Sequence, residues 1–219
     1  MGYNLHQWDF LNKNMERYIS DYEGKWMLEF GNQRLKQSVL DDLKIKDHVA
    51  KHYFQNVGFN HISIDLNGEY GSLPINLGKK IIKPELIDKF DVVTNSGTTE
   101  HVEPYESQYE AFYNIHACGK KGSLFFHMVP EAGGLVDHCQ NYYTINFFER
   151  LSEENNYEIL SLYSHKIKTG NLVFACLRKN EDNIFCEDRD KVLKHIIKKR
   201  YSKKALREFK RKKTYRHIE

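Results

Sequence analysis

Two histidines and a glutamate are the side chains in this sequence best suited to moving a proton near neutral pH. Glu100 and His101 are adjacent and follow the β-rich run Phe90 to Val93 after a short loop, and His138 lies in a long polar loop further on. Imidazole titrates near neutrality and can accept a hydroxyl proton. We therefore predict catalytic roles for His101, Glu100 and His138. Alternatively, Glu100 and His101 only begin a helix, where the helix dipole favours an acid.

A carboxylate and a glycine end the first strongly apolar segment, KWMLEFGNQ, at residues 25–33. Its bulky residues are typical of a parallel strand that is buried on both faces. Gly31 allows a tight turn or the close approach of the backbone to a ligand. A strand, a glycine turn and a helix form the first unit of a nucleotide-binding α/β sheet, whose ligand lies beyond the carboxyl ends of the strands. The alternative is an ordinary buried strand followed by a turn.

A second acid lies at the end of a second predicted strand, in HISIDLNG. Asp65 occupies the position whose carboxylate accepts hydrogen bonds from a ribose diol in nucleotide-binding sheets. It is followed by Leu66 and a turn signature, so Asp65 could also be only a turn-forming residue. Asn95 and Gly97 form the loop after the strand that begins at Phe90, where they would frame a ligand or make a bare turn.

The remaining segments alternate between helical and extended patterns. Apolar residues at helical spacing predict an amphipathic helix within residues 1–24, which Gly24 would end. Further patterns predict a helix over 104–118, a strand over 122–130, a helix over 147–155, a closing pair of antiparallel strands and one long basic helix from Arg189. We divide the chain into an N-terminal helix (1–24), a central domain (25–188) and a basic helical tail (189–219).

Composition indicates a globular protein without membrane-spanning segments. The chain has 219 residues, of which 40% are hydrophobic and 29% are charged. This length suits one sizeable domain, and no apolar run approaches the length of a spanning helix. The N-terminus lacks the pattern of a signal peptide. Four cysteines without a CxxC pair favour a reduced, cytoplasmic protein. His101, Glu103 and His138 could hold a metal, but no tight ligand spacing supports one, and we predict none.

The net charge of +3 conceals a strong asymmetry. Residues 191–219 hold 13 Lys and Arg against two acids, whereas the preceding 190 residues hold 20 against 28. An acidic body therefore carries a basic tail, whose residues 191–217 could contact nucleic acid phosphates or an anionic surface. The alternative is a solvated tail that binds nucleic acid only non-specifically.

The order of these segments resembles that of the class I S-adenosylmethionine-dependent methyltransferases. MLEFGNQ looks like their first motif, SIDLNG like the acidic end of their second strand, FDVVTNSGTTEHV like the motif after their fourth strand, and GSLFFHMVP like their fifth strand. Within that superfamily, TNSGTTEHV resembles uncharacterised members of small-molecule or sugar type. One departure is that their first motif has two or three glycines after the acid, whereas here only Gly31 is present.

This resemblance implies a Rossmann-like three-layer αβα sandwich, with a mostly parallel seven-stranded sheet and an antiparallel C-terminal hairpin. It also implies S-adenosyl-L-methionine as cofactor, bound by Glu29, Gly31, Asn32, Asp65, Leu66, Asn95 and Gly97. The function it implies is methyl transfer to a hydroxyl or amine of a small molecule or sugar. Two alternatives stay open: a methyltransferase directed to RNA or another polyanion by the basic tail, and a non-catalytic binding protein on a decayed methyltransferase fold.

Overall fold

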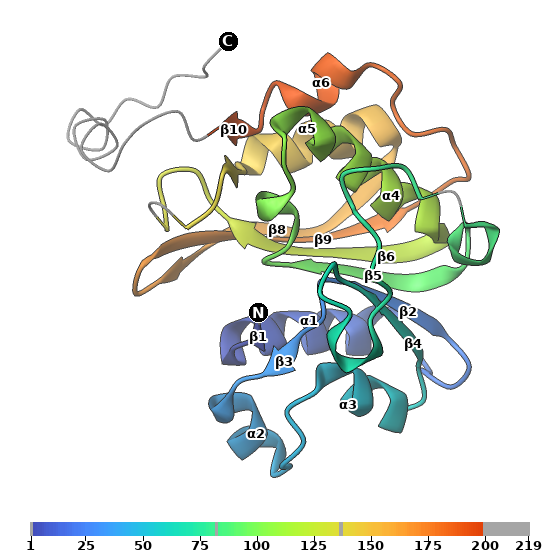
Figure 1. Ribbon diagram of the computed structural model, residues 1–219, viewed down its shortest axis with the longest axis vertical. Coiled ribbons are helices and arrows are strands. Elements are labelled where there is room, and N and C mark those ends of the chain that lie inside the picture. The colour runs from blue at the N-terminus through green and yellow to red at the C-terminus, as the bar shows by residue number, and fades with distance from the viewer. Residues whose placement is uncertain (1, 82, 136–137, 199–219) are drawn as a thin grey trace.

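A six-stranded sheet forms the centre of the protein (Figure 1). The computed structural model describes residues 2–81, 83–135 and 138–198. Four strands of the sheet run parallel, and β9 is antiparallel to both of its neighbours. In the spatial order of the sheet, the strands are β4 (Asn60–Ile64), β2 (Trp26–Phe30), β5 (Phe90–Ser96), β6 (Gly119–Pro130), β9 (Gly170–Lys179) and β8 (Tyr157–Ile167).

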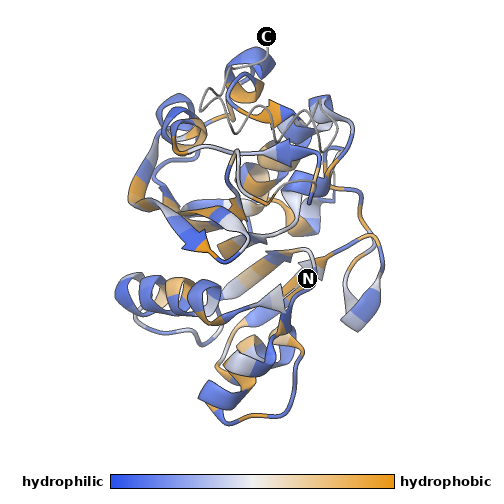
Figure 2. Ribbon diagram, turned by 90° about the vertical axis from the view of Figure 1, so that its left-hand side faces the viewer, coloured by the Kyte–Doolittle hydropathy of each residue, from blue (hydrophilic) through white to orange (hydrophobic). Residues whose placement is uncertain are grey.

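Helices cover both faces of this sheet, so the three-layer αβα architecture predicted from the sequence is confirmed. One face carries α1 (Leu5–Tyr18), α2 (Gln37–Leu43) and α3 (Ala50–Asn56), and the other carries α4 (Gln108–Cys118), α5 (Ile145–Asn155) and α6 (Arg189–Leu193). In Figure 2 the helices are striped with polar and apolar residues, as expected of helices that bury one side.

Each face of the sheet has its own buried apolar cluster. Phe125 and Phe126 are consecutive in β6, yet Phe125 packs in the cluster with Phe112 of α4 and Phe126 in the cluster with Trp8 of α1. Successive side chains of a strand point to opposite faces. A strand covered on both faces is therefore apolar at both positions, which explains the continuous apolar runs in the sequence.

The sheet differs from the expected one in its number of strands. Seven strands were predicted, but the described residues form six in the main sheet. The segment 72–78 contributes only one parallel bridge to the sheet, between Leu73 and Ile64. Pro74 follows directly and has no backbone N–H to continue the ladder. Two short strand pairs lie outside the main sheet: β1 (Gly2–Tyr3) with β3 (Arg34–Leu35), and β7 (Asn141–Tyr142) with β10 (Ile197–Lys198).

The single long helix predicted from Arg189 is wrong for the part that the structure describes. Helix α6 ends at Leu193, and the chain then forms β10. The Tyr105 hydroxyl donates a hydrogen bond to the carbonyl of Leu193 at 2.6 Å, and Val192 and Ile196 are buried in the core. These contacts fix the segment against α4 and α5 instead of letting it extend. The rest of the predicted tail helix, 199–219, lies outside the described residues.

Two further predictions concern the ends of the described chain. The N-terminal helix occupies Leu5–Tyr18, a shorter span than the 1–24 segment assigned to it. Asn4 caps it by accepting a hydrogen bond from the backbone N–H of Gln7 at 3.1 Å. Across the described residues, every helix is too short or too polar to cross a membrane.

Candidate functional site

Glu29, at the end of β2, faces the interior of the protein. Its side chain is only 1% exposed, and it accepts hydrogen bonds from the Tyr3 hydroxyl at 2.9 Å and from the backbone N–H of Gln33 at 3.2 Å. Burial raises the pKa of Glu29 to about 7 and lowers the pKa of nearby His61 to about 3. The His61 Nε2 atom lies 3.8 Å from Glu29. Because both side chains are neutral over most of the pH range between about 3 and about 7, they do not form an ion pair there. Direct contact of Glu29 with a ligand would require Tyr3 to move.

The turn after β2 is closed against the loop after β5. Gly31 has a φ of +80°, and a Cβ atom there would lie 2.2 Å from the Thr98 Oγ1 atom. The Thr98 hydroxyl donates a hydrogen bond to the carbonyl of Phe30 at 2.7 Å. Gly31 is thus required both by its backbone conformation and by the close packing of Thr98. This packing joins the two loops at which a ligand of such a sheet is expected.

Asn32 links that turn to the loop after β4. Its side-chain amide donates hydrogen bonds to the Asn67 Oδ1 atom and to the Glu69 carbonyl, both at 2.9 Å. Its backbone N–H donates to the Asp65 carboxylate at 3.1 Å, and the other oxygen of Asp65 accepts from the Asn67 N–H at 3.2 Å. Asn32 and Asp65 are therefore brought together, and both carboxylate oxygens of Asp65 are oriented by the backbone.

A cavity of about 350 Å³ lies at the carboxyl ends of β4 and β5. Asp65, Leu66 and His101, three of the residues predicted from the sequence, contribute to its wall. The wall does not include Glu29, Gly31, Asn32, Asn95 or Gly97 among the described residues. The cavity is lined by Ile64, Asp65, Leu66, Ile75, Asn76, Leu77, Thr98, His101, Val102 and Glu103.

Asn95 and Gly97 fix the conformation of the loop after β5. The Asn95 amide donates a hydrogen bond to the Thr99 hydroxyl at 2.9 Å and contacts the His127 Nδ1 atom at 3.1 Å. The Asn95 Oδ1 atom accepts a hydrogen bond from the Thr99 N–H at 3.2 Å, so both ends of its amide are used within the protein. Gly97 turns the chain with a φ of +65°. These residues position Thr98 and His101, which do line the cavity.

The three predicted catalytic side chains meet beside this cavity, whose wall includes His101. One atom each of Glu100, His101 and His138 lies within 4.8 Å of the other two, and the two imidazole rings are 5.2 Å apart. The Glu100 side chain is 1% exposed, and neither of its oxygens accepts a hydrogen bond from another described residue. Burial raises the pKa of Glu100 to about 8. Partial burial, and to a lesser extent His138, lower the pKa of His101.

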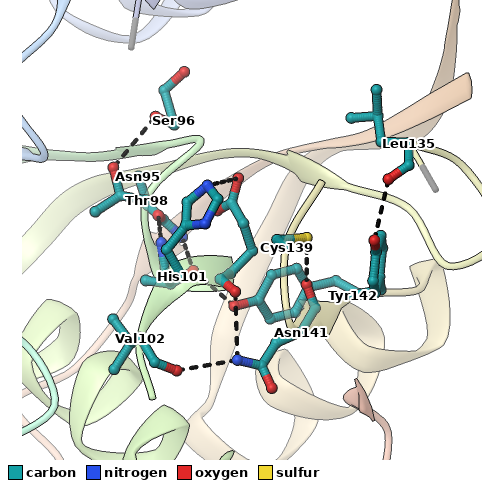
Figure 3. Close-up of polar contacts among 12 residues, drawn as sticks. Asn95, Ser96, Thr98, His101, Val102, Leu135, Cys139, Asn141 and Tyr142 are labelled. Carbon is teal, nitrogen blue, oxygen red and sulfur yellow. Dashed lines mark hydrogen bonds and ion pairs between the residues drawn. The ribbon is translucent and has the colours of Figure 1, made fainter. Parts of the chain in front are cut away.

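Several residues that build the site were not predicted from the sequence. Tyr3 reaches Glu29 across 26 positions of sequence, and the Asn141 amide donates to the Val102 carbonyl at 3.0 Å across 39 (Figure 3). Thr98, which closes the turn at Gly31, stands inside the quoted motif but was not given a role. Only Thr98 carried a usable signal, because it lies between the predicted residues Gly97 and Glu100.

Comparison with known proteins identifies the fold of this chain but not a sequence family. Neither a family model nor a curated protein matches the sequence. Solved structures do match. The 1,6-didemethyltoxoflavin-N1-methyltransferase of Burkholderia thailandensis, with S-adenosylhomocysteine bound, aligns with a TM-score of 0.50 at 13% identity, over 80% of this chain and 87% of that one.

Two further structures give the same result. The magnesium protoporphyrin IX methyltransferase of Synechocystis aligns with a TM-score of 0.53 at 10% identity, over 80% of this chain and 83% of that one. The N-methyltransferase NodS of Bradyrhizobium japonicum aligns with a TM-score of 0.51 at 10% identity, over 80% and 86% of the two chains. Both were solved with S-adenosylhomocysteine. The chain has the class I methyltransferase fold. The resemblance inferred from the sequence is thereby confirmed at the level of the fold.

Proposed function

We propose that the protein is an S-adenosylmethionine-dependent methyltransferase that acts on a hydroxyl or amine of a small molecule or sugar. The observation that carries this proposal is the cavity between the ends of β4 and β5. In it, a carboxylate suited to a ribose, Asp65, and a side chain suited to proton transfer, His101, line the same space. Ligands of open α/β sheets bind at this edge.

The described residues fit the adenosine half of the cofactor. Each Asp65 oxygen accepts one backbone hydrogen bond, and a carboxylate oxygen has capacity for a further one, from a ribose hydroxyl. Leu66 and Leu77 give the cavity an apolar wall for a planar base, and its volume lies in the range of small-molecule sites. Glu29 supports the methionine half only indirectly, by fixing the Gln33 backbone. The cofactor would supply a methyl group on a positively charged sulfur.

Glu100, His101 and His138 are proposed to position the acceptor and to receive its proton. His101 faces the cavity and its side chain is 42% exposed, whereas Glu100 is buried behind it. These side chains would hold the acceptor oxygen or nitrogen toward the methyl group of a bound cofactor, and the imidazole of His101 would receive the proton that the acceptor loses. Holding the two reactants in line is the other contribution of the protein.

The role of Asp65 is tested by calorimetric titration of the full chain with S-adenosylhomocysteine. Asp65→Ala removes a charged hydrogen-bond acceptor, which corresponds to about 2 kcal/mol, or roughly a 30-fold rise in Kd. Asp47→Ala is the matched control, because Asp47 also accepts a backbone N–H two residues on, from Val49, but does not line the cavity. Equal affinities of Asp65→Ala and Asp47→Ala would remove Asp65 from the binding site.

One observation favours a second candidate, a non-catalytic binding protein on this fold. Tyr3 occupies one oxygen of Glu29, and Thr98 packs directly on Gly31, so the turn after β2 is closed. A protein of this kind would show no calorimetric signal with S-adenosylhomocysteine in the native sequence. Micromolar binding that depends on Asp65 would support the methyltransferase instead.

A further inference from the structure

We propose that Glu100, His101 and His138 form a binding site for one divalent transition-metal ion. The sequence offered His101, Glu103 and His138 as possible ligands without a tight spacing to support them, and the structure places Glu100, not Glu103, with the two histidines. The fold brings together the loop after β5 and the loop after β6, and one potential ligand atom of each side chain lies within 4.8 Å of the others.

The buried carboxyl of Glu100 is the first observation that points to a ligand. Its side chain is 1% exposed, and both oxygens lack a hydrogen-bond partner among the described residues. A buried polar group without partners is energetically unfavourable. The nearest cationic candidate in the structure, the His101 Nε2 atom, is 4.0 Å away and too distant for a hydrogen bond. A bound cation would satisfy this carboxylate.

The donor set is the second observation. Two imidazole nitrogens and one carboxylate oxygen form a set that binds zinc with an open position and also binds other first-row metals. Ligands at 2.0–2.2 Å from one ion are at most about 4.3 Å apart, so the group has to contract by about half an ångström or more. His101 and His138 are both exposed and can supply that movement, whereas Glu100 is fixed in the interior.

The geometry differs from that of an ordinary surface pair in the same chain. His52 and Asp47 are about half exposed and lie 2.7 Å apart, so each satisfies the other directly. Glu100 has two histidines near it but makes no such contact with either. The His52–Asp47 pair, with two potential ligands, therefore serves as the experimental control for the group of three potential ligands around Glu100.

The position of the site suggests what the ion would do. His101 is shared between the three-residue group and the wall of the cavity, so an ion held there would face the space proposed for the acceptor. A metal-bound hydroxyl loses its proton more readily than a free one. This role rests on the proposed methyltransferase function and favours an acceptor with a hydroxyl oxygen. Metal binding itself rests only on the three side chains.

The test uses the full chain without an affinity tag, after treatment with a chelator. Zinc and manganese salts are titrated separately by calorimetry into the native sequence and into Glu100→Gln, His138→Ala and His52→Ala. We expect one ion per chain, a loss of at least tenfold in affinity for Glu100→Gln and His138→Ala, and no change for His52→Ala. The visible spectrum of the cobalt-substituted protein should show ligand-field bands that Glu100→Gln abolishes.

Two results would overturn the proposal: no binding to the native sequence, or binding that is equal in Glu100→Gln, His138→Ala and His52→Ala. Glu100→Gln preserves the shape of a buried side chain, and His138 is exposed, so near-ultraviolet circular dichroism should confirm that both variants are folded. Titration with S-adenosylhomocysteine separates the two proposals. Metal binding without cofactor binding contradicts the methyltransferase, and cofactor binding without metal binding contradicts only the metal site.

Discussion

At the scale of single residues, the two sequence-predicted acids at the ends of β2 and β5 are buried deeply enough to change their protonation. Glu29 and Glu100 both have pKa values raised by burial, to about 7 and about 8. They differ in their surroundings. Glu29 accepts two hydrogen bonds within the protein, whereas Glu100 accepts none from another described residue. The oxygens of Glu29 are therefore already hydrogen-bonded within the protein, whereas those of Glu100 remain available to a ligand.

Glu29→Gln should change how stability depends on pH. The folded protein holds the Glu29 proton up to a pKa of about 7, above the ordinary value of 4.5, so this group makes the fold less stable as pH rises through that interval. The loss amounts to about 3 kcal/mol. A glutamine has the same shape and no charge. We expect the variant to be more stable than the native sequence at pH 8, and the difference to shrink toward pH 5, in urea unfolding.

Glu16→Gln is the control for this measurement, because Glu16 is exposed on α1. In Glu16→Gln, the difference between the free energies of unfolding at pH 8 and at pH 5 should equal that of the native sequence. If Glu29→Gln behaves in the same way as Glu16→Gln, Glu29 does not hold its proton in the folded protein.

At the scale of elements, the site depends on how two loops fit together. The turn at Gly31 follows β2, the loop with Thr98 follows β5, and these strands are neighbours in the sheet. Parallel strands place their carboxyl ends at one edge, which brings the two loops into contact. The Thr98 hydroxyl then donates to the carbonyl of Phe30, at the end of β2.

Gly31→Ala should destabilise the protein far more than Gly68→Ala. Both glycines have positive φ, +80° and +65°, so both substitutions strain the backbone by about 1 kcal/mol. Only at Gly31 does an added Cβ meet another atom, Thr98 Oγ1 at 2.2 Å, while nothing lies within 4 Å at Gly68. We expect a total loss of about 3 kcal/mol or more for Gly31→Ala in urea unfolding. Equal losses would show that Thr98 moves aside freely.

The sequence predicted the elements better than the contacts between them. Continuous apolar runs such as Phe125 and Phe126 identified buried strands, because a strand covered on both faces has no polar alternation. The meeting of His138 with His101 and the approach of Tyr3 to Glu29 depend on the tertiary fold, which no local pattern encodes. The segment 72–78 does not add a seventh strand to the sheet for a local reason, the missing N–H of Pro74.

At the scale of the whole molecule, the described part of the C-terminal region packs on the core. Residues up to Lys198 belong to the fold: Val192, Leu193 and Ile196 are buried against α4 and α5, and β10 pairs with β7. Residues 199–219, outside the described part, hold 10 Lys and Arg against two acids. Removing them changes the formal net charge from +3 to −5, since 3 − (10 − 2) = −5.

Truncation after Arg189 should therefore destabilise the fold relative to truncation after Lys198. The longer truncation removes three buried apolar side chains, each contributing about 1.5–3 kcal/mol, for a total of roughly 4.5–9 kcal/mol. The measurement is urea unfolding of both truncated chains beside the full one. Similar unfolding midpoints for all three would show that α6 does not stabilise the core. The chain ending at Lys198 is the appropriate one for testing whether the basic tail binds a polyanion.

The hydrogen bond between Tyr3 and Glu29 has a consequence for how tightly any ligand could bind. Tyr3 belongs to β1, which pairs with β3 directly after the turn at Gly31, so the start of the chain and this turn share one set of contacts. A ligand that takes the Glu29 oxygen must displace the phenol, and its measured affinity then includes the free energy of that release. By reciprocity, the same ligand loosens the N-terminal segment by an equal amount. Binding of a ligand at this edge of the sheet and docking of β1 are therefore thermodynamically coupled.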